Sequence, residues 1–283
     1  MASTYRSVTE ALAGKLPDGA FAHVPKSFDI IGAIAIIDVP VEVAEHELAI
    51  AKAVMAVHKH VTTVLAKDKA HGGEFRTQSL RHVVGEDTRE TLVRENGYEC
   101  LVDVEQVYFS PRLSTERLRV AQAAGPDERV LVLFSGCGPY VLALAKHSIA
   151  QEIVGVEKNP VGHRYAEENL RRNKIKNARV VCGDAGDLWF LGDERFDRIV
   201  MPHPSAVFDF VPAALEVASS RCTLHIYTFG AEDEAPALAA KIRAVCEEHG
   251  FALTSLAAVK AGRNKPYSYR WCFDATVEKK RAQ

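Results

Sequence analysis

The sequence lacks the features that mark membrane and secreted proteins. No apolar run approaches the ~18 residues that a membrane-spanning helix needs. Residues 1–19 contain no apolar core of a secretory signal, and they carry the acids Glu10 and Asp18. We therefore expect a cytoplasmic protein without a membrane partner, with the nucleus and the mitochondrion as alternatives.

Cysteine pairs with metal-binding spacing are missing as well. The chain has six cysteines, and no two of them form a C-x-x-C motif. Scattered thiols favour reduced core residues in a reducing compartment over disulfide bonds or a metal site. The sequence therefore predicts no metal centre.

An excess of charge of either sign is also absent. The 283 residues include 35 Lys and Arg against 37 Asp and Glu, which gives a formal net charge of -2. This balance provides no global attraction to nucleic acid, so any contact with RNA must come from local patches. The candidates are the basic segments 171–179 and 260–265, each of which is also consistent with ordinary solvated surface.

The clearest pattern that is present is a strand–turn–helix–strand unit in the middle of the chain. The continuous apolar run 130–134 is typical of a strand buried on both faces of a parallel sheet. Gly136 and Gly138 follow, where no Cβ blocks a ligand. A second predicted strand ends on Glu157, placed to accept both hydroxyls of a ribose. A third ends on Asp184, placed to accept from an adenine amino group.

Three interpretations of this unit stand open. It is an ordinary βαβ unit with a chance acid, a nicotinamide site, or a site for S-adenosylmethionine. The nicotinamide motif G-x-G-x-x-G fails, because Val141 and Leu142 occupy the region of its third glycine. The spacing fits S-adenosylmethionine better.

Seven motifs together resemble those of the archaeal and eukaryotic tRNA (guanine-37, N1)-methyltransferases and of the related wybutosine-pathway aminocarboxypropyltransferases. The likeness covers roughly residues 27 to 275, and Y-F-S-P-R-L-x-x-E-R is specific to the methyltransferase branch. The motifs are S-F-D-I-I-G at 27–32, G-E-F-R at 73–76, E-N-G at 95–97, V-Y-F-S-P-R-L-S-T-E-R at 107–117, F-S-G-C-G-P at 134–139, V-E-K-N-P at 156–160 and D-R-I-V-M at 197–201.

The resemblance implies methylation of guanine N1 beside a tRNA anticodon, with S-adenosylmethionine as cofactor. It places the general base on Glu116 and the contact to the guanine O6 on Arg76. Guanine N1 keeps its proton at neutral pH, so a carboxylate must remove it while a donor stabilises the charge at O6. Tyr108 and Arg112 would shape the pocket for a flipped base, and Phe134 would join the cofactor contacts.

Two departures from the family pattern keep other functions open. The aspartate of the D-x-F-x-G-x-G motif is Val132 here, and the asparagine of an N-L-P motif is Pro202. Proline has no side-chain amide and no backbone N–H, so Pro202 cannot donate to a base at this substrate-binding position. The neighbouring His203 either takes over that contact or is a loop imidazole without a catalytic role. The first alternative is an enzyme that transfers an aminocarboxypropyl group. The second is a protein that binds the cofactor or tRNA but has lost catalysis.

The predicted architecture is α/β. A lead-in segment over residues 1–24 precedes a small α+β RNA-positioning domain over 25–108, which contains a long predicted helix at 41–65. A class I methyltransferase domain over 109–283 follows, with a Rossmann-like sheet of seven strands and an antiparallel end. The sequence carries no signal for the oligomeric state.

Overall fold

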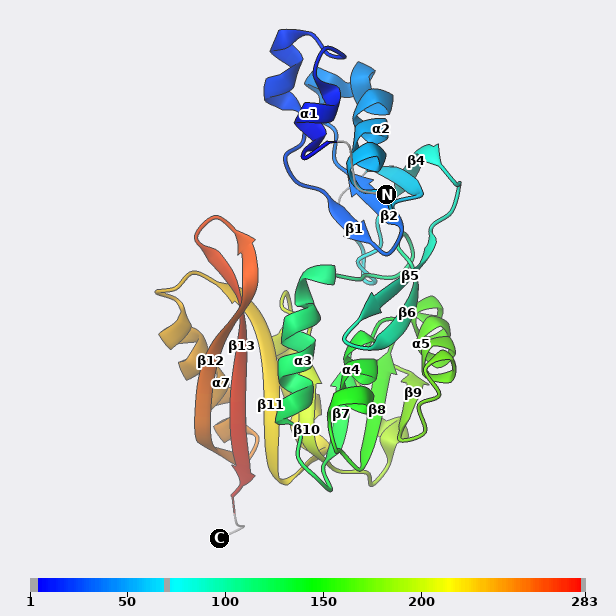
Figure 1. Cartoon of the computed structure of the whole chain (residues 1–283). Coiled ribbons are helices and arrows are strands. Elements are labelled where there is room, and N and C mark those ends of the chain that lie inside the picture. The colour runs from blue at the N-terminus through cyan, green and yellow to red at the C-terminus, as the bar shows by residue number, and fades with distance from the viewer. Residues whose placement is uncertain (1–4, 69–71, 281–283) are drawn as a thin grey trace. The chain divides into compact units, whose positions relative to one another are not determined.

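The computed structural model describes residues 5–68 and 72–280. It divides into two compact units, which Figure 1 shows in blue to cyan and in green to red. The first unit comprises residues 1–95 and 99–111, and the second comprises residues 96–98 and 112–283. Among the described residues, no helix is long and apolar enough to cross a membrane.

A four-stranded sheet of order β1-β2-β3-β4 forms the centre of the first unit. Apolar side chains of α1 and α2 pack against it, and Leu12 and Ile50 are almost fully buried, so residues from Val8 onward belong to this core. The elements are α1 (Val8–Leu12), η1 (Asp18–His23), β1 (Asp29–Ile31), β2 (Ile34–Ile37), η2 (Val41–His46), α2 (Glu47–Val57), β3 (Thr63–Lys67) and β4 (Leu80–Gly85), followed by the two-stranded sheet of β5 (Glu90–Glu95) and β6 (Tyr98–Asp103).

The long helix predicted over residues 41–65 is wrong. The segment begins as a 3-10 helix, α2 ends at Val57, and residues Thr63–Lys67 form the strand β3. The β-branched residues from Val61 to Val64 are stiff at χ1 and fit a pleated sheet better than a helix. β3 pairs with β2 on one side and β4 on the other, so its buried residues have an apolar pattern that a helix also produces.

The second unit contains the predicted seven-stranded sheet with an antiparallel end. Its strand order is β12-β13-β11-β10-β7-β8-β9, and only β13 runs against its two neighbours. The elements are η3 (Pro111–Leu113), α3 (Ser114–Ala123), β7 (Arg129–Leu133), α4 (Pro139–His147), β8 (Glu152–Glu157), α5 (Pro160–Arg172), β9 (Ala178–Cys182), η4 (Trp189–Leu191), β10 (Phe196–Met201), η5 (Val207–Asp209), α6 (Val211–Glu216), β11 (Ala218–Gly230), α7 (Ala235–Glu248), β12 (Phe251–Lys265) and β13 (Ser268–Lys279).

The two faces of this sheet differ in chemistry. Side chains alternate along a strand, so each strand contributes every second residue to one face. One face is an apolar core that includes residues of α6 and α7, such as Leu215 and Ile242. The other face carries several polar residues and is covered by α3 and α4, which lie side by side in front of the sheet in Figure 1. Its polar residues come from three strands: Arg198, His225, Tyr227, Cys272 and Asp274.

Candidate active site

The turn after β7 is built for a close approach of a ligand to the backbone. Phe134, Gly136 and Gly138 all have positive φ angles, 53°, 57° and 87°. The left-handed region is strained for a phenylalanine, and such strain concentrates at functional sites. Gly138 is the N-cap of α4, so the backbone turns sharply at the carboxyl end of the strand.

Glu157 joins the ends of two neighbouring strands. Its Oε2 accepts a hydrogen bond from the Gly136 N–H at 2.6 Å, and its Oε1 accepts from the Asn159 N–H at 2.7 Å. Burial raises the pKa of Glu157, while the backbone N–H groups oppose that rise. Each carboxylate oxygen keeps a second lone pair, so the group is able to accept from a diol as well.

Asp184 lies at the end of the next strand along the sheet. Its Oδ2 pairs with the Lys158 Nζ at 2.7 Å, and its Oδ1 accepts from the Gly186 N–H at 2.8 Å. The hydrogen bond from Lys158, followed by that from Gly186, lowers the pKa of Asp184. The acid is therefore held ionised at the same edge of the sheet as Glu157, because the parallel strands all end there.

Three aromatic rings gather at this edge. The ring centroids of Phe134 and His203 are 4.8 Å apart, and Phe210 stands edge-on to Phe134 at 4.8 Å. A Cβ added to Gly186 would come within 3.5 Å of Phe210, so the aromatic cluster reaches the loop after Asp184. The sequence analysis named Phe134 and His203 but missed Phe210, because a phenylalanine before a helix carries no signal of its own.

The two departures from the family pattern have different surroundings. Val132 is completely buried within β7 and pairs with Gly155 and Val200. Pro202 directly follows β10 and is half-buried, and the His203 N–H donates to the Met201 carbonyl. The His203 side chain therefore projects from the end of β10 beside the Phe134 ring.

Glu116 lies in the first turn of α3 and is only 7% exposed. The Tyr227 hydroxyl donates to its Oε1 at 2.6 Å. The Arg119 guanidinium donates to Oε2 through Nε and to Oε1 through Nη2, both at 2.8 Å. A carboxylate offers about four acceptor positions, and three are used here, which leaves one on Oε2.

Arg119 also binds a second carboxylate. Its Nη1 donates to the Asp274 Oδ2 at 2.6 Å, and Arg119 therefore bridges Glu116 and Asp274. Although burial alone would raise the pKa of Asp274, hydrogen bonds from His225 and Arg119 hold it well below its usual range. One half-buried cation thus serves two anions.

The neighbouring His225 is neutral and carries its proton on Nδ1. Its Nε2 lies 2.7 Å from the Arg198 Nη1, which can only donate, so Nε2 must accept. Its Nδ1 lies 2.6 Å from the Asp274 Oδ1 and must therefore donate to it. Burial lowers the pKa of His225, although Asp274 opposes that effect. Arg198 continues the network to Glu128 through two hydrogen bonds.

His225, Cys272 and Asp274 also bring three possible metal ligands within 4.8 Å of one another. Both nitrogens of His225 already have partners, and the Asp274 oxygens accept from His225 and Arg119. A divalent ion there would face the guanidinium groups of Arg119 and Arg198. The cluster is therefore better described as part of a charge network than as a metal centre.

The remaining predicted residues divide between the two units. Arg76 and Tyr108 belong to the first unit, and the Arg76 guanidinium carbon lies 5.0 Å from the centroid of the Tyr108 ring. This distance is within the range of a cation–π contact. Arg76 also has a positive φ of 52°. Arg112 lies in η3 at the start of the second unit, and its side chain is exposed.

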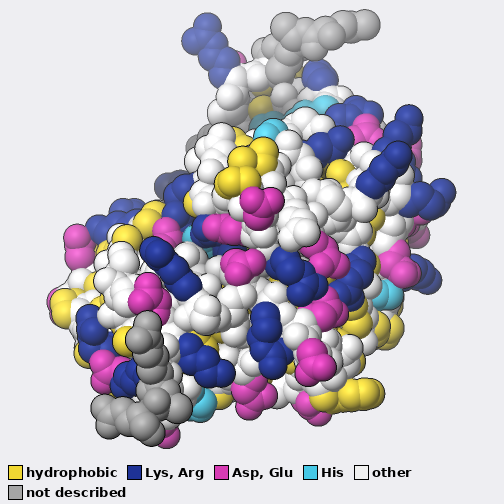
Figure 2. Space-filling view, turned by 90° about the horizontal axis from the view of Figure 1, so that it is seen from below, with side chains coloured by type: hydrophobic (Ala, Val, Ile, Leu, Met, Phe, Trp, Pro, Cys, Tyr) yellow, Lys and Arg dark blue, Asp and Glu magenta, His cyan; other side chains and the backbone are white. Residues whose placement is uncertain are grey.

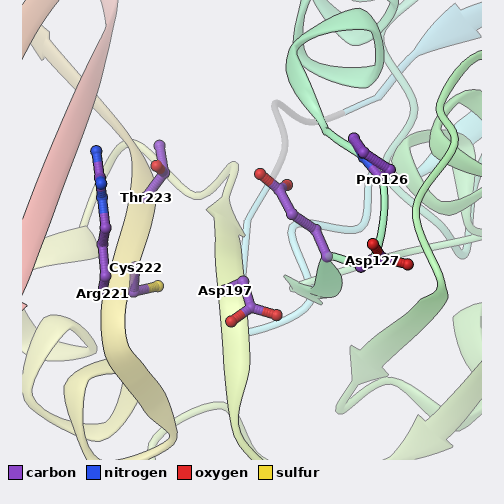
Figure 3. Close-up of a pocket in the computed structure, with 7 residues that line it drawn as sticks. Pro126, Asp127, Asp197, Arg221, Cys222 and Thr223 are labelled. Atoms are coloured by element: carbon purple, nitrogen blue, oxygen red, sulfur yellow. The ribbon is translucent and has the colours of Figure 1, made fainter.

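A pocket lies at the opposite edge of the sheet, near the amino ends of the strands (Figure 3). Asp197 contributes from β10, Arg221 and Cys222 from β11, and Pro126 and Asp127 from the loop before β7. None of the predicted cofactor residues lines it. The pocket is therefore separate from the site at the carboxyl ends.

Arg119, Tyr227 and Asp274 were not predicted from the sequence. For Tyr227 and Asp274 the signal was polar residues at alternate positions in otherwise apolar strands, in H-x-Y on β11 and in C-x-D on β13, whereas Arg119 on α3 carried none. The register places His225 opposite Asp274 and Tyr227 opposite Cys272. Without that register, the alternation gives no reason to connect residues so far apart in the chain.

Known proteins match nearly the whole chain. A family model described as the TRM5/TYW2 methyltransferase domain matches residues 91–254, and one described as the TYW2 N-terminal domain matches residues 8–88. The chain is 37% identical over 232 residues to the tRNA (guanine(37)-N(1))-methyltransferase Trm5b of Pyrococcus abyssi, which covers 82% of this chain and 67% of that protein. The crystal structure of Trm5b from Pyrococcus abyssi has a TM-score of 0.84 at 35% identity, over 93% of this chain and 78% of that one.

Relatives with a different reaction also match. The tRNA(Phe) (4-demethylwyosine(37)-C(7)) aminocarboxypropyltransferase of Pyrococcus horikoshii is 29% identical over 273 residues, 96% of both chains. The structure of Pyrococcus horikoshii TYW2 in complex with MeSAdo has a TM-score of 0.81 at 27% identity, over 96% of this chain and 98% of that one. A complex of aTrm5 with tRNALeu has a TM-score of 0.79 at 25% identity, over 95% and 78%.

The burial of a neutral His225 leads to a prediction about stability and pH. The pKa of His225 is lowered in the folded protein from an ordinary value of 6.5, so the unfolded chain binds the proton more readily. The free energy of unfolding should therefore fall as the pH drops below 6.5, by up to ~1.4 kcal/mol per pH unit from this group. His225→Asn, which can still accept from Arg198 and donate to Asp274, should lose that component.

Urea unfolding at several pH values checks this, with tryptophan fluorescence as the signal because Trp189 and Trp271 both lie in the second unit. His249→Asn, at the exposed end of α7, is the matched control and should keep the wild-type slope. An unchanged slope in His225→Asn would contradict the burial of a neutral imidazole at this position.

Proposed function

Because the chain belongs to the TRM5/TYW2 methyltransferase family, we propose that it uses S-adenosylmethionine to methylate N1 of guanine 37 in tRNA. The family matches include both methyltransferases and aminocarboxypropyltransferases, so family membership alone does not choose the transferred group. The choice of methyl transfer rests on Glu116 and on the segment Y-F-S-P-R-L-x-x-E-R in which it lies.

The position of Glu116 is the observation that carries this proposal. Met201 pairs with Ile226, so the next residues, Pro202 and Tyr227, are level with one another at the carboxyl edge of the sheet. Tyr227 holds Glu116 by a 2.6 Å hydrogen bond. A buried carboxylate with one remaining acceptor position is therefore fixed at the edge where Gly136 and Glu157 also lie.

The chemistry needs such a group. Glu116 would accept the proton of guanine N1 on Oε2 while the nitrogen lone pair forms the new bond to the methyl carbon. The cofactor, when bound, supplies the methyl group and leaves as a neutral thioether. Arg76 would stabilise the negative charge that develops on O6, and Tyr108 and Arg112 would hold the flipped base. His203 would supply a ring contact in place of the family's amide at Pro202.

The cofactor would be held by this chain's strand ends. Glu157 would accept the ribose hydroxyls and Asp184 the adenine amino group, while the positive-φ turn at Gly136 and Gly138 gives room for the methionine end. The fit is supported by the burial of Glu157 and by the absence of a Cβ at both glycines. Phe134 would contribute a ring to the same site.

The cofactor assignment predicts a selective loss of binding. Glu157→Ala removes two charge-assisted hydrogen bonds to the ribose, and S-adenosylmethionine affinity should fall about tenfold to a hundredfold by calorimetry. Because burial raises the pKa of Glu157, affinity for the wild type should also weaken on acidification sooner than for an exposed glutamate. Tighter binding of NAD than of S-adenosylmethionine would refute the assignment.

The catalytic assignment predicts a loss of turnover with retained binding. Glu116→Gln keeps the size of the side chain but cannot take a proton, so the single-turnover rate on unmodified tRNA should fall at least about a hundredfold. Arg76→Ala should lower the rate as well. The measurement is transfer from labelled cofactor, with nucleoside analysis of the product, and the exposed Glu248→Gln serves as the matched control.

Nucleoside analysis also separates the alternatives. An aminocarboxypropyl product would replace methyl transfer by the second reaction of the family. Cofactor binding without any product would favour a binding protein that has lost catalysis, which Val132 and Pro202 motivate. Pro202→Asn then tests whether the missing amide is responsible, because restoring it should raise the rate.

The structure separates the two basic segments that we considered for tRNA. Segment 171–179 connects the end of α5 to the start of β9 and so lies at the amino edge, roughly 20 Å from the carboxyl ends of a six-residue strand. Arg179 pairs with Glu152 and Glu194, and Arg171 pairs with Glu168. Figure 2 views the molecule from below and shows positive and negative side chains interspersed rather than a basic patch.

Residues 262–268 form a hairpin tip, which we call the arm. Gly230, the last residue of β11, pairs with Tyr269, so the arm extends past the carboxyl edge of the sheet (Figure 1). Arg263 and Lys265 are exposed on it, and Tyr267 is 89% exposed. Two cations beside an exposed ring suit a nucleic-acid backbone and an unstacked base.

The position of the arm predicts which residues cause the salt dependence of tRNA binding. The double variant Arg263→Ala, Lys265→Ala should weaken binding and reduce the slope of log affinity against log salt by about two. Lys174→Ala with Lys176→Ala removes the same charge at the opposite edge and should change the slope little. Filter binding at several salt concentrations checks both, and equal losses in the two variants would argue against the arm.

A further inference from the structure

Glu116 lies at one end of a buried to half-buried chain of charged and polar groups that the proposed reaction does not by itself require. The order is Glu116, Arg119, Asp274, His225, Arg198 and Glu128, and each neighbour is within hydrogen-bonding distance of the next. The groups come from α3, β13, β11 and β10 and from the loop before β7. Burying this many charges is costly, so each must be balanced by its neighbours.

Asp274 determines how much of the positive charge of Arg119 acts on Glu116. Arg119 donates two hydrogen bonds to Glu116, at 2.8 Å each, and two to Asp274, at 2.6 and 3.3 Å. If Glu116 were the only anion bound to Arg119, the whole positive charge of the guanidinium would act on the Glu116 carboxylate. Such a carboxylate resists protonation, because the proton would leave the cation unpaired in a buried site.

We propose that Asp274 is a positioning residue for the catalytic base: by sharing Arg119, it holds the Glu116 carboxylate in place and keeps it able to accept the substrate proton. This proposal rests on the proposed function of Glu116. When Glu116 is protonated, Arg119 keeps Asp274 as its anion, and the pair stays neutral. When Glu116 is ionised, Tyr227 and Arg119 hold it by three hydrogen bonds.

His225 fixes the far side of Asp274. Because Arg198 forces the His225 Nε2 to accept, Nδ1 donates to the Asp274 Oδ1. The Cys272 thiol donates to the same oxygen at 3.2 Å. Asp274 is thus held in place by hydrogen-bond donors from β11 and from its own strand.

Several other titratable and charged groups surround Glu116 and its partners. The titratable and charged groups that face it or its partners are Arg117 and Arg119 on α3, Tyr140 on α4, His225 and Tyr227 on β11, Cys272 and Asp274 on β13, and Arg198 on β10. Burial raises the pKa of Tyr140, Tyr227 and Cys272 well above neutral pH, so these three stay uncharged.

Two variants should move the titration of Glu116 in opposite directions. Asp274→Asn leaves Arg119 to Glu116 alone, so the acid limb of the pH–rate profile should move to lower pH by about one unit. The plateau rate should also fall, because a weaker base accepts the proton less readily. Tyr227→Phe removes a donor from the ionised carboxylate, so its acid limb should move to higher pH.

A direct titration keeps this test separate from the proposed function. Carbon-13 NMR of labelled glutamate carboxyls, with Glu116 assigned by comparison with Glu116→Gln, follows protonation without any turnover. Glu278→Gln, exposed on the same strand as Asp274, is the matched control and should leave the Glu116 titration unchanged. Thermal melts verify that each variant is folded.

The outcomes are distinct. Opposite displacements of the Glu116 titration in Asp274→Asn and Tyr227→Phe support the proposal, whether or not the enzyme turns over. If Asp274→Asn is folded and loses activity while the Glu116 titration stays at its wild-type position, Asp274 has only a structural role and the proposal is overturned. If the titrations move but Glu116→Gln keeps full activity, the network exists and the function proposed for Glu116 fails instead.

Discussion

The second unit depends on a largely buried layer of charge between its central sheet and α3. Arg119 is held by carboxylates of its own helix and of β13, and Arg198 ties β10 to the loop before β7 and to β11. Removing one partner would leave an uncompensated buried charge, which costs far more than a surface ion pair contributes. The register of three strands and the rotation of α3 are therefore constrained together.

This layer explains why the two faces of one sheet have such different compositions. Strands β7, β10, β11 and β13 all place aliphatic side chains on the face towards α6 and α7. On the other face, the same strands carry Arg198, His225 and Asp274. The apolar face supplies most of the hydrophobic stabilisation, while the polar face gives up burial energy to hold a carboxylate in a defined state.

Much of the fold could be predicted from the sequence, because parallel strands buried on both faces form unmistakable apolar runs. The same local logic located Glu157 and Asp184 at strand ends. It failed over residues 41–65, since a strand buried between two others has an apolar pattern that also suits a helix. The pairing of β3 with β2 and β4, and not the intrinsic preference of its residues, determines that this part of the segment is a strand.

The candidate site was predictable only where a motif is continuous in the chain. Glu116 and Arg112 lie within one short segment, whereas Phe210 and Asp274 reach the site through tertiary structure alone. An arginine in a helix ordinarily faces solvent, and the bridge formed by Arg119 depends on a strand 155 positions away. A single sequence holds no information that pairs two such residues.

The position of β13 has a consequence for how a break in the chain would act. This strand lies between β11 and β12, and it brings the aspartate that anchors Arg119. A protein that lost β13 by cleavage of the β12–β13 hairpin would keep every nucleotide-binding motif, but β11 and β12 would each lose a pairing partner. The same cut would therefore expose the edge of β11 to other chains and leave Arg119 without one of its two carboxylates.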